Sequence, residues 1–208
     1  MATAASTSSS LPMINTENDV PCLAIGKSGT VIATGGRDLN LWRLDEAKSR
    51  FSNVACVPGT SKQIECLKID NEEKTIVYGH QGGAMKLFDV ESGKVKATYT
   101  GHASTISTVM FHPMGDFLLS GSKDKTLKLW DIRQKGSIKS YKGHTRTVNC
   151  LAVSPDGQLV SAGSDDGSVR SWDMLSEKVQ QNFQHKGPVV AIQFHPEELL
   201  LVSSSSDR

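Results

Sequence analysis

Residues 101–131 read GHASTISTVMFHPMGDFLLSGSKDKTLKLWD, and this stretch decides the fold of the chain. It opens with Gly101-His102 and closes with Trp130-Asp131, so the imidazole at 102 and the indole at 130 lie 28 residues apart. The same separation recurs in two further pairs, which are His144 with Trp172 and Thr60 with Phe88. A fixed separation that returns along a chain indicates copies of one structural unit.

The residues between these two markers predict short strands joined by turns. Ile106 to Phe111 is apolar on both faces, which is typical of a strand covered by neighbouring sheets. Pro113 presets the backbone for the turn that follows, and Lys123-Asp124-Lys125 predicts a second, tighter turn. The predicted strands are residues 106–111, 117–120, 127–130 and 137–141. One copy is therefore expected to form a four-stranded antiparallel sheet.

A Gly-His to Trp-Asp unit with a period near 42 residues resembles the WD40 repeat, in which each unit forms one blade of a β-propeller. The resemblance implies an all-β, incomplete propeller of about four and a half blades. It also implies a hydrogen-bonded relay in which the aspartate accepts from the histidine, a serine joins the chain, and the tryptophan donates its indole N–H. By position the relay residues are His102, Ser120, Asp124 and Trp130, then His144, Asp166 and Trp172, then His185, Ser203 and Asp207.

Five copies can be aligned along the chain. Their histidine positions are Thr16, Thr60, His102, His144 and His185. We expect a disordered tail over residues 1–14 and a partial propeller over 15–208, with repeats at 15–45, 56–90, 98–132, 140–174 and 181–208. The tryptophan of the fifth copy would fall near position 213, so we expect these 208 residues to be either a fragment of a longer product or an incomplete gene model.

Apolar residues recur four and nine positions after each histidine position, and we expect them to pack blade against blade. At four positions on they are Val20, Ile64, Ile106, Val148 and Val189, and at nine positions on they are Ile25, Ile69, Phe111, Val153 and Phe194.

The first two copies depart from the pattern. In the first, Trp42 follows Asp38 by four residues, against six between Asp124 and Trp130, so two residues are missing from the turn or the third strand. This predicts a distorted first blade. The second copy has Gly82 and Phe88 in place of aspartate and tryptophan, so its fold must rest on apolar packing.

Composition excludes several classes of function. A net charge of +1 gives no argument for nucleic acid or another polyanion as a partner, and no apolar run reaches the ~20 residues of a membrane-spanning helix. Cys22, Cys66 and Cys150 share one repeat position, where the other copies have Thr108 and Ala191, so we interpret them as small packing residues. The cysteines lack the close spacing of zinc or redox sites.

Residues that could suggest catalysis or metal binding have structural interpretations. Gly26-Lys27-Ser28 lacks the first glycine of a phosphate-binding loop, which would stand at Pro21. His112 and His195 are interpreted as solvent-facing turn residues, and His80 as a turn residue without a partner. The relay of the third copy superficially resembles a hydrolase triad, but the repeat explains each member structurally. We therefore expect no enzyme activity, no cofactor and no metal site.

Basic residues gather in the third copy. They are Lys123, Lys125, Lys128, Arg133, Lys135 and Lys139. Such residues often only solvate turns and outer strands, but together they could form a basic rim for an acidic protein partner, such as the acidic tails of tubulin.

Longer segments show a more specific resemblance. They are LWDIRQKG at 129–136, YKGH at 141–144, VNCL at 148–151 and SPDG at 154–157. Between Asp19 and Arg208 the chain resembles the non-catalytic, WD40-bearing subunit of katanin, the microtubule-severing complex. This resemblance implies a scaffold that targets severing to microtubules, in the cytoplasm and on the cytoskeleton, including centrosomes or spindles. In that family a helical domain outside the repeats binds the catalytic subunit, so we do not expect residues 1–208 to recruit the ATPase by that route.

Two other readings stay open. Trp130-Asp131-Ile132-Arg133 matches a Trp-Asp-x-Arg pattern that docks some WD40 proteins to the adaptor of cullin-RING ubiquitin ligases, with Arg133 in the contact by resemblance. The other is a general WD40 scaffold with unrelated protein partners, because the variable loops set the specificity of such scaffolds.

Overall fold

The computed structural model describes residues 14, 16, 19–45, 50–58, 62–134 and 136–207. The expected tail over residues 1–13 lies outside these ranges, as do the histidine position Thr60 and the basic residue Lys135. Within the described ranges no helix is long and apolar enough to cross a membrane.

The described residues form five antiparallel sheets, each built from consecutive strands. The first contains β1 (Cys22–Ile25), β2 (Val31–Gly35), β3 (Leu39–Asp45) and β4 (Arg50–Val57). The second contains β5 (Ile64–Ile69), β6 (Thr75–His80), β7 (Ala84–Asp89) and β8 (Lys94–Thr100). The third contains β9 (Ile106–Phe111), β10 (Phe117–Ser122), β11 (Leu127–Asp131) and β12 (Ser137–Tyr141). The fourth contains β13 (Val148–Val153), β14 (Leu159–Ser164), β15 (Ser168–Asp173) and β16 (Val179–Gln184), and the fifth contains β17 (Val189–Phe194) and β18 (Leu201–Ser205).

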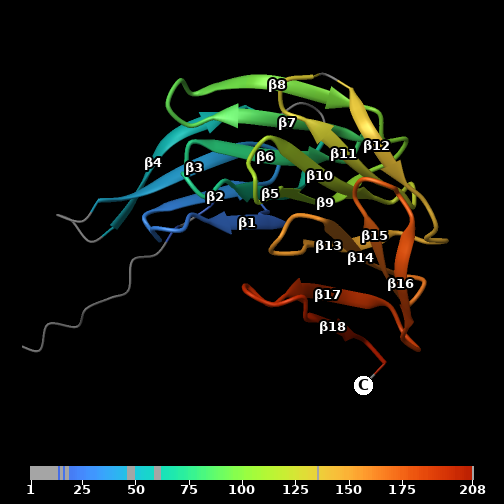
Figure 1. Ribbon diagram of the computed structural model, residues 1–208. Coiled ribbons are helices and arrows are strands. Elements are labelled where there is room, and N and C mark those ends of the chain that lie inside the picture. The colour runs from blue at the N-terminus through green and yellow to red at the C-terminus, as the bar shows by residue number, and fades with distance from the viewer. Residues whose placement is uncertain are drawn as a thin grey trace, which may run out of the picture.

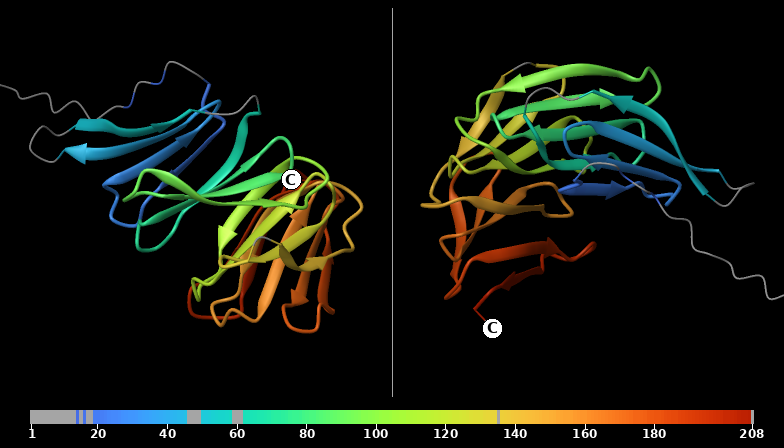
Figure 2. Two further views of the ribbon diagram at one scale, coloured as in Figure 1. Left: turned by 90° about the horizontal axis from the view of Figure 1, so that it is seen from above. Right: turned by 180° about the vertical axis from the view of Figure 1, so that it is seen from behind.

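The sheets stand side by side in chain order, like blades around an axis (Figure 1). Contacts run between the first strands of successive sheets, from β1 to β5, β9, β13 and β17. The two further views in Figure 2 show the resulting arc, with the first blade at one end and the two-stranded fifth blade at the other. The predicted all-β fold of about four and a half propeller blades is confirmed.

A repeated contact between a glycine and a branched side chain joins each blade to the next. Gly121 on β10 lies so close to Val148 on β13 that a Cβ at this glycine would come within 3.0 Å of the valine. The equivalent pairs are Gly35 with Ile64, Gly79 with Ile106, and Gly163 with Val189. All four branched residues are at most 1% exposed. The positions four after each histidine position therefore carry the contact between blades, as expected for Ile64, Ile106, Val148 and Val189.

The apolar residues nine positions after each histidine position are less buried than those at four positions. Ile69, Phe111, Val153 and Phe194 are half-buried and pack at the edges of the apolar clusters. Ile25 on β1 is 60% exposed, because the face of the first blade that carries it has no preceding blade against it.

The first blade is regular, so the expected distortion was wrong for the sheet itself. Its four strands pair in order, and Trp42 faces Ile32 on β2 just as Trp130 faces Leu118 on β10. The two missing residues come out of the β2–β3 turn, because only residues 36–38 lie between the paired Gly35 and Leu39, whereas residues 122–126 lie between the paired Gly121 and Leu127. A tight turn absorbs the deletion without changing the strand register.

The second blade replaces the relay by aromatic packing. Tyr78 and Phe88 are 2% and 0% exposed and join the apolar cluster that includes Leu39 and Leu41 of the first blade. The ring of His80 lies edge-on to Tyr78 with centroids 5.3 Å apart. Apolar packing therefore holds this blade in place of hydrogen bonds, as the sequence indicated.

The fold predicts a gradient of local stability. Backbone amides of β9–β11 and β13–β15 should exchange most slowly, because their blades are covered on both faces and also contain most of the polar relay, and protection should fall toward β1 and β18. The end faces carry exposed apolar side chains, with Leu23 at 61% and Val202 at 63%. Hydrogen exchange read by mass spectrometry checks this gradient, and uniform protection across all five blades would contradict it.

Candidate functional site

The third blade contains a complete buried relay. His102 Nδ1 lies 2.8 Å from Asp124 Oδ2, and His102 Nε2 lies 2.7 Å from Ser120 Oγ. Trp130 Nε1 donates to the same Ser120 oxygen at 2.8 Å. The histidine comes from the β8–β9 loop, the serine from β10, the aspartate from the β10–β11 turn and the tryptophan from β11. The relay thus ties one turn and one loop to the two central strands.

The chemistry of the four groups fixes the direction of every hydrogen bond. The ionised Asp124 carboxylate can only accept, so His102 Nδ1 carries a proton and Nε2 of the neutral imidazole accepts from the Ser120 hydroxyl, while Ser120 in turn accepts from the Trp130 indole. The proton on the imidazole then sits on Nδ1 and is donated to the Asp124 carboxylate. A neutral imidazole therefore satisfies the whole chain.

The pKa shifts agree with this assignment. Burial lowers the pKa of His102 below its ordinary value, and the bond to Asp124 opposes that effect only in part. Burial raises the pKa of Asp124, but hydrogen bonds from Thr126, His102 and the Ala103 amide outweigh it and hold the pKa below its usual range. The pair is thus a neutral histidine donating to a carboxylate, not an ion pair.

The fourth blade lacks one member of the relay. Ala162 stands where the third blade has Ser120, and the buried Nε2 of His144 has no hydrogen-bond partner among the described residues. The other ring nitrogen lies 3.0 Å from Ser168 Oγ and 3.3 Å from Asp166 Oδ2. The missing hydroxyl therefore leaves a buried acceptor unsatisfied, which is a cost in stability.

The fifth and first blades contain partial versions. His185 Nε2 lies 2.9 Å from Ser203 Oγ, and His185 Nδ1 lies 3.6 Å from Asp207 Oδ2. In the first blade Trp42 Nε1 donates to Thr34 Oγ1 at 3.0 Å, but Thr16 occupies the histidine position.

The relay does not form a catalytic site. Ser120 is 0% exposed and His102 is 7% exposed, so no substrate can reach the hydroxyl that a hydrolase would use as its nucleophile. No group of three or more metal-ligating side chains is found within the described ranges. The arrangement can position turns, and it offers no accessible group for bond-making chemistry.

Comparison with protein families identifies the repeat. The model of the WD domain, G-beta repeat, matches residues 93–131, 135–173 and 177–208. The chain belongs to the WD40-repeat family. Each matched segment contains one of the three histidines that the structure places in a relay, and begins near the outer strand of the preceding blade.

Curated relatives share the repeat and differ widely in their names. Autophagy-related protein 16 of Arabidopsis thaliana is 30% identical over 94 residues, which cover 45% of this chain and 18% of the relative. NACHT domain- and WD repeat-containing protein 1 of Mus musculus is 37% identical over 72 residues, 35% of this chain and 5% of the relative. Nuclear distribution protein nudF 2 of Penicillium rubens is 34% identical over 84 residues, which cover 38% of this chain and 18% of the relative. The chain thus matches less than a fifth of the length of each, and none of the three is a katanin subunit.

The structure separates the predicted basic residues of the third WD40 blade. Lys123 and Lys125 are exposed in the β10–β11 turn, and Lys128 is half-buried on β11 beside His102. Arg133 lies in the β11–β12 turn, at the opposite end of β11, and Lys139 lies on the outer strand β12. The five described residues are therefore not brought together in one patch.

Two of these basic residues are held by contacts within the chain. Arg133 Nη2 lies 2.7 Å from Asp116 Oδ1, and Lys139 Nζ donates to the carbonyl oxygens of Met174 and Leu175. Lys123 and Lys125 use only their backbone amides, which donate to Thr105 and Ser122. The side chains of Lys123, Lys125 and Arg133 are exposed, whereas Lys139 is half-buried.

Two histidine assignments require correction. His112 is 5% exposed and not solvent-facing, since its Nε2 lies 3.0 Å from the Gly157 carbonyl oxygen and its ring packs edge-on against Phe117. His80 lies on β6, is 3% exposed, and its Nδ1 lies 3.2 Å from the Lys62 carbonyl oxygen. His195 is exposed, as expected.

The cysteines lie at blade contacts. The Sγ atoms of Cys22, Cys66 and Cys150 lie close to Gly35, Gly79 and Gly163, beside the branched residue of the next blade. Burial raises the pKa of Cys22 to about 12 and of Cys150 to about 11, so both thiols stay protonated and unreactive at neutral pH. The repeated glycine that they contact was missed from the sequence, although its recurrence at positions 35, 79, 121 and 163 is visible there.

Removing the relay serine should destabilise the chain. Ser120→Ala leaves His102 Nε2 without its donor and Trp130 Nε1 without its acceptor, and we expect a loss of ~1–3 kcal/mol in the free energy of unfolding. Urea denaturation followed by tryptophan fluorescence measures it. Ser137→Ala, at an exposed position on β12, is the control, and equal effects of the two substitutions would contradict a structural relay.

Adding the missing hydroxyl should stabilise the fourth blade. Ala162→Ser places an oxygen where it can donate to His144 Nε2, as Ser120 donates to His102, and we expect a gain of about 1 kcal/mol. The same urea measurement applies. A neutral or destabilising effect would show that the unpaired nitrogen of His144 does not lower the free energy of unfolding.

The histidines predict a loss of stability in acid. Burial lowers the pKa values of His80, His102 and His144 below 6.5, so the unfolded chain takes up protons before the folded one does. The stability that these three histidines contribute is complete above pH 6.5. It is lost as the pH falls toward their lower pKa values in the folded chain. The urea midpoint should therefore drop between about pH 7 and about pH 5, and an unchanged or rising midpoint would contradict the assignment.

Proposed function

We propose that this chain is a non-enzymatic protein-interaction scaffold. The observation that carries the proposal is that the complete relay, in the third blade, is buried and serves to hold turns in place. WD40 repeats point to protein–protein interaction. Rigid blades that end in exposed turns of variable sequence suit recognition of protein partners.

The exposed turns differ from blade to blade while the strands do not. The residue just before each relay aspartate position is Arg37, Gln81, Lys123, Asp165 and Ser206 in the five copies. Arg37, Gln81, Lys123 and Asp165 stand in the turn between the second and third strands of their blades, and Ser206 directly follows β18; the five side chains differ in charge and hydrogen-bonding capacity. Such variation on a constant framework supports a surface that selects its partner.

The sharper form of the proposal is a katanin-like scaffold that binds microtubules through basic side chains and acts on the cytoskeleton. What supports it is the sequence resemblance over residues 129–157 and the exposure of Lys123 and Lys125. Because Lys139 donates to backbone carbonyl oxygens of the fourth blade and Arg133 lies at the opposite end of β11, we narrow the proposed surface to the β10–β11 turn and Lys128.

Docking to a cullin-RING ligase adaptor is the second candidate. Arg133 is 74% exposed on its side chain, which favours such a contact, but its guanidinium pairs with Asp116. An adaptor would have to supply a carboxylate in place of Asp116, since an exposed ion pair is worth little by itself and can be exchanged.

Co-sedimentation with microtubules tests the sharper form. Binding by Lys123 and Lys125 to acidic tubulin tails should weaken steeply as salt is added, because surface charges are screened over about 8 Å at physiological ionic strength. Lys123→Glu/Lys125→Glu should abolish co-sedimentation. Lys27→Glu/Lys94→Glu makes the same change of charge at exposed positions on other blades and should have little effect. Binding that ignores salt, or that survives the first double substitution, would overturn the microtubule proposal.

A further inference from the structure

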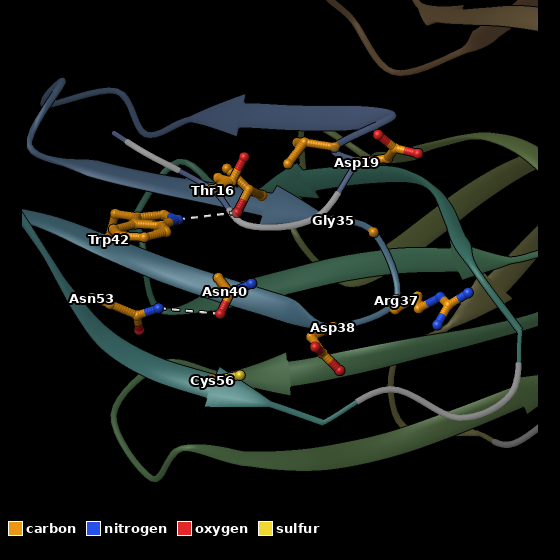
Figure 3. Close-up of a pocket in the computed structure, with 12 residues that line it drawn as sticks. Thr16, Asp19, Gly35, Arg37, Asp38, Asn40, Trp42, Asn53 and Cys56 are labelled. Carbon is orange, nitrogen blue, oxygen red and sulfur yellow. Dashed lines mark hydrogen bonds between the residues drawn. The ribbon is translucent and has the colours of Figure 1, made fainter. Parts of the chain in front are cut away.

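The first blade contains a cavity where other blades contain their own histidine. Its volume is about 320 Å³, near the lower end of the ~300–1,000 Å³ that small-ligand pockets occupy. It lies over one face of the β1–β4 sheet, with Trp42 and Asn40 of β3 along one side and Thr16 and Asp19 of the preceding segment along the other (Figure 3). Two sequence changes create it, since Thr16 replaces a histidine and the β2–β3 turn is two residues shorter.

The walls of this cavity correspond to the groups that hold an imidazole elsewhere in the chain. In the third blade the imidazole lies against Trp130, with ring centroids 5.9 Å apart, and binds Ser120 Oγ. In the fourth blade the ring of His144 lies 5.4 Å from that of Trp172. In the first blade Trp42 and Thr34 repeat the tryptophan and the hydroxyl, with the same indole-to-oxygen hydrogen bond. Among the described residues of the first blade, no imidazole bridges them.

The Thr34 hydroxyl is a buried donor directed at this space. Thr34 is 6% exposed, and its oxygen accepts from Trp42 Nε1 at 3.0 Å. Because the indole can only donate, Thr34 keeps its own proton, and no described residue accepts it. In the third blade the equivalent proton goes to an imidazole nitrogen. A buried donor of this kind calls for an acceptor atom in the cavity.

The rest of the lining is polar and suits the second nitrogen of such a ring. Asn53 Nδ2 donates to Asn40 Oδ1 at 3.1 Å, which leaves the Asn53 carbonyl oxygen available as an acceptor (Figure 3). Asp38 lies in the turn at the position of Asp124, and its side chain is drawn at the edge of the same cavity. A ring with one acceptor nitrogen and one N–H, stacked near an indole, matches these groups better than a purely apolar ring does.

We propose that the first blade binds an imidazole, the histidine side chain of a partner protein, which completes the relay between two molecules. The source of the ring rests on the proposed scaffold function, whereas the cavity and its preference for imidazole do not. Binding would bury the Thr34 proton in a hydrogen bond and place the ring against Trp42, as His102 lies against Trp130.

A titration with N-acetyl-histidine methylamide at neutral pH tests the cavity without any partner. The indole N–H resonance of Trp42 should shift saturably, while those of the buried Trp130 and Trp172 stay in place. N-acetyl-phenylalanine methylamide, which has a ring of similar shape and no nitrogen, should leave all three resonances unchanged. Equal shifts with both probes, or no shift at all, would overturn the proposal.

Two variants sharpen the test. Thr34→Val removes the hydroxyl at constant shape and should weaken binding about fivefold or more, the loss of roughly one hydrogen bond, whereas Thr100→Val on the exposed end of β8 should not. Unchanged Trp130 and Trp172 resonances in Thr34→Val show that the fold is intact.

Thr16→His should fill the cavity from within the chain, raise the urea midpoint and abolish the probe-induced shift. Binding that persists undiminished in both Thr34→Val and Thr16→His would place the ligand elsewhere and overturn the proposal.

Because the titration contains no microtubules, its failure is distinguishable from failure of the scaffold function. If the probe binds and co-sedimentation fails, the cavity stands and the microtubule assignment is overturned. If co-sedimentation succeeds and the probe does not bind, the imidazole proposal alone is overturned.

Discussion

The contact between a strand glycine and a branched side chain of the next blade is the constraint on which the rest of this structure depends. At Gly35, Gly79, Gly121 and Gly163 there is no room for a Cβ, because Ile64, Ile106, Val148 or Val189 fills the space. None of these four glycines has a positive φ, so the requirement is for space and not for backbone freedom. The close approach buries the branched residue almost completely and sets the spacing of the blades.

The polar relay is secondary to this packing. It is complete only in the third blade, lacks a hydroxyl in the fourth, and is replaced by Tyr78 and Phe88 in the second, yet the second and fourth blades form regular four-stranded sheets. A framework held by apolar contacts tolerates the loss of individual polar members, and their positions become free to vary. In the first blade, where the histidine position is Thr16, the sheet still forms and a cavity lies beside the Thr34 hydroxyl. The site proposed for a partner's histidine therefore follows from a framework that does not depend on the relay.

Much of the fold could be predicted because the repeat imposes one register on all copies. The period located the strands, the buried positions four after each histidine position and the relay of His102, since these depend on local spacing. Three features escaped prediction because they depend on three-dimensional contacts and turn geometry that the repeat spacing does not encode. His112 is buried by the turn of the next blade at Gly157, His80 is buried against Tyr78, and the deletion before Trp42 is absorbed by a turn and not by the sheet. The basic residues were near one another in sequence but lie at opposite ends of β11, because a strand of five residues separates the two turns.

The most direct test of this account is a double-mutant cycle at Gly121 and Val148. Gly121→Ala should destabilise the chain by about 1–3 kcal/mol in urea denaturation, the usual cost of overpacking, although alanine in place of a strand glycine is otherwise favourable. In the background of Val148→Ala, which removes the methyl groups nearest the new Cβ and leaves Thr108 Cγ2 as its close neighbour, the same substitution should cost less, giving a clear coupling energy. Strictly additive effects, or a Gly121→Ala variant as stable as the parent chain, would contradict the claim that this contact sets the packing of the blades.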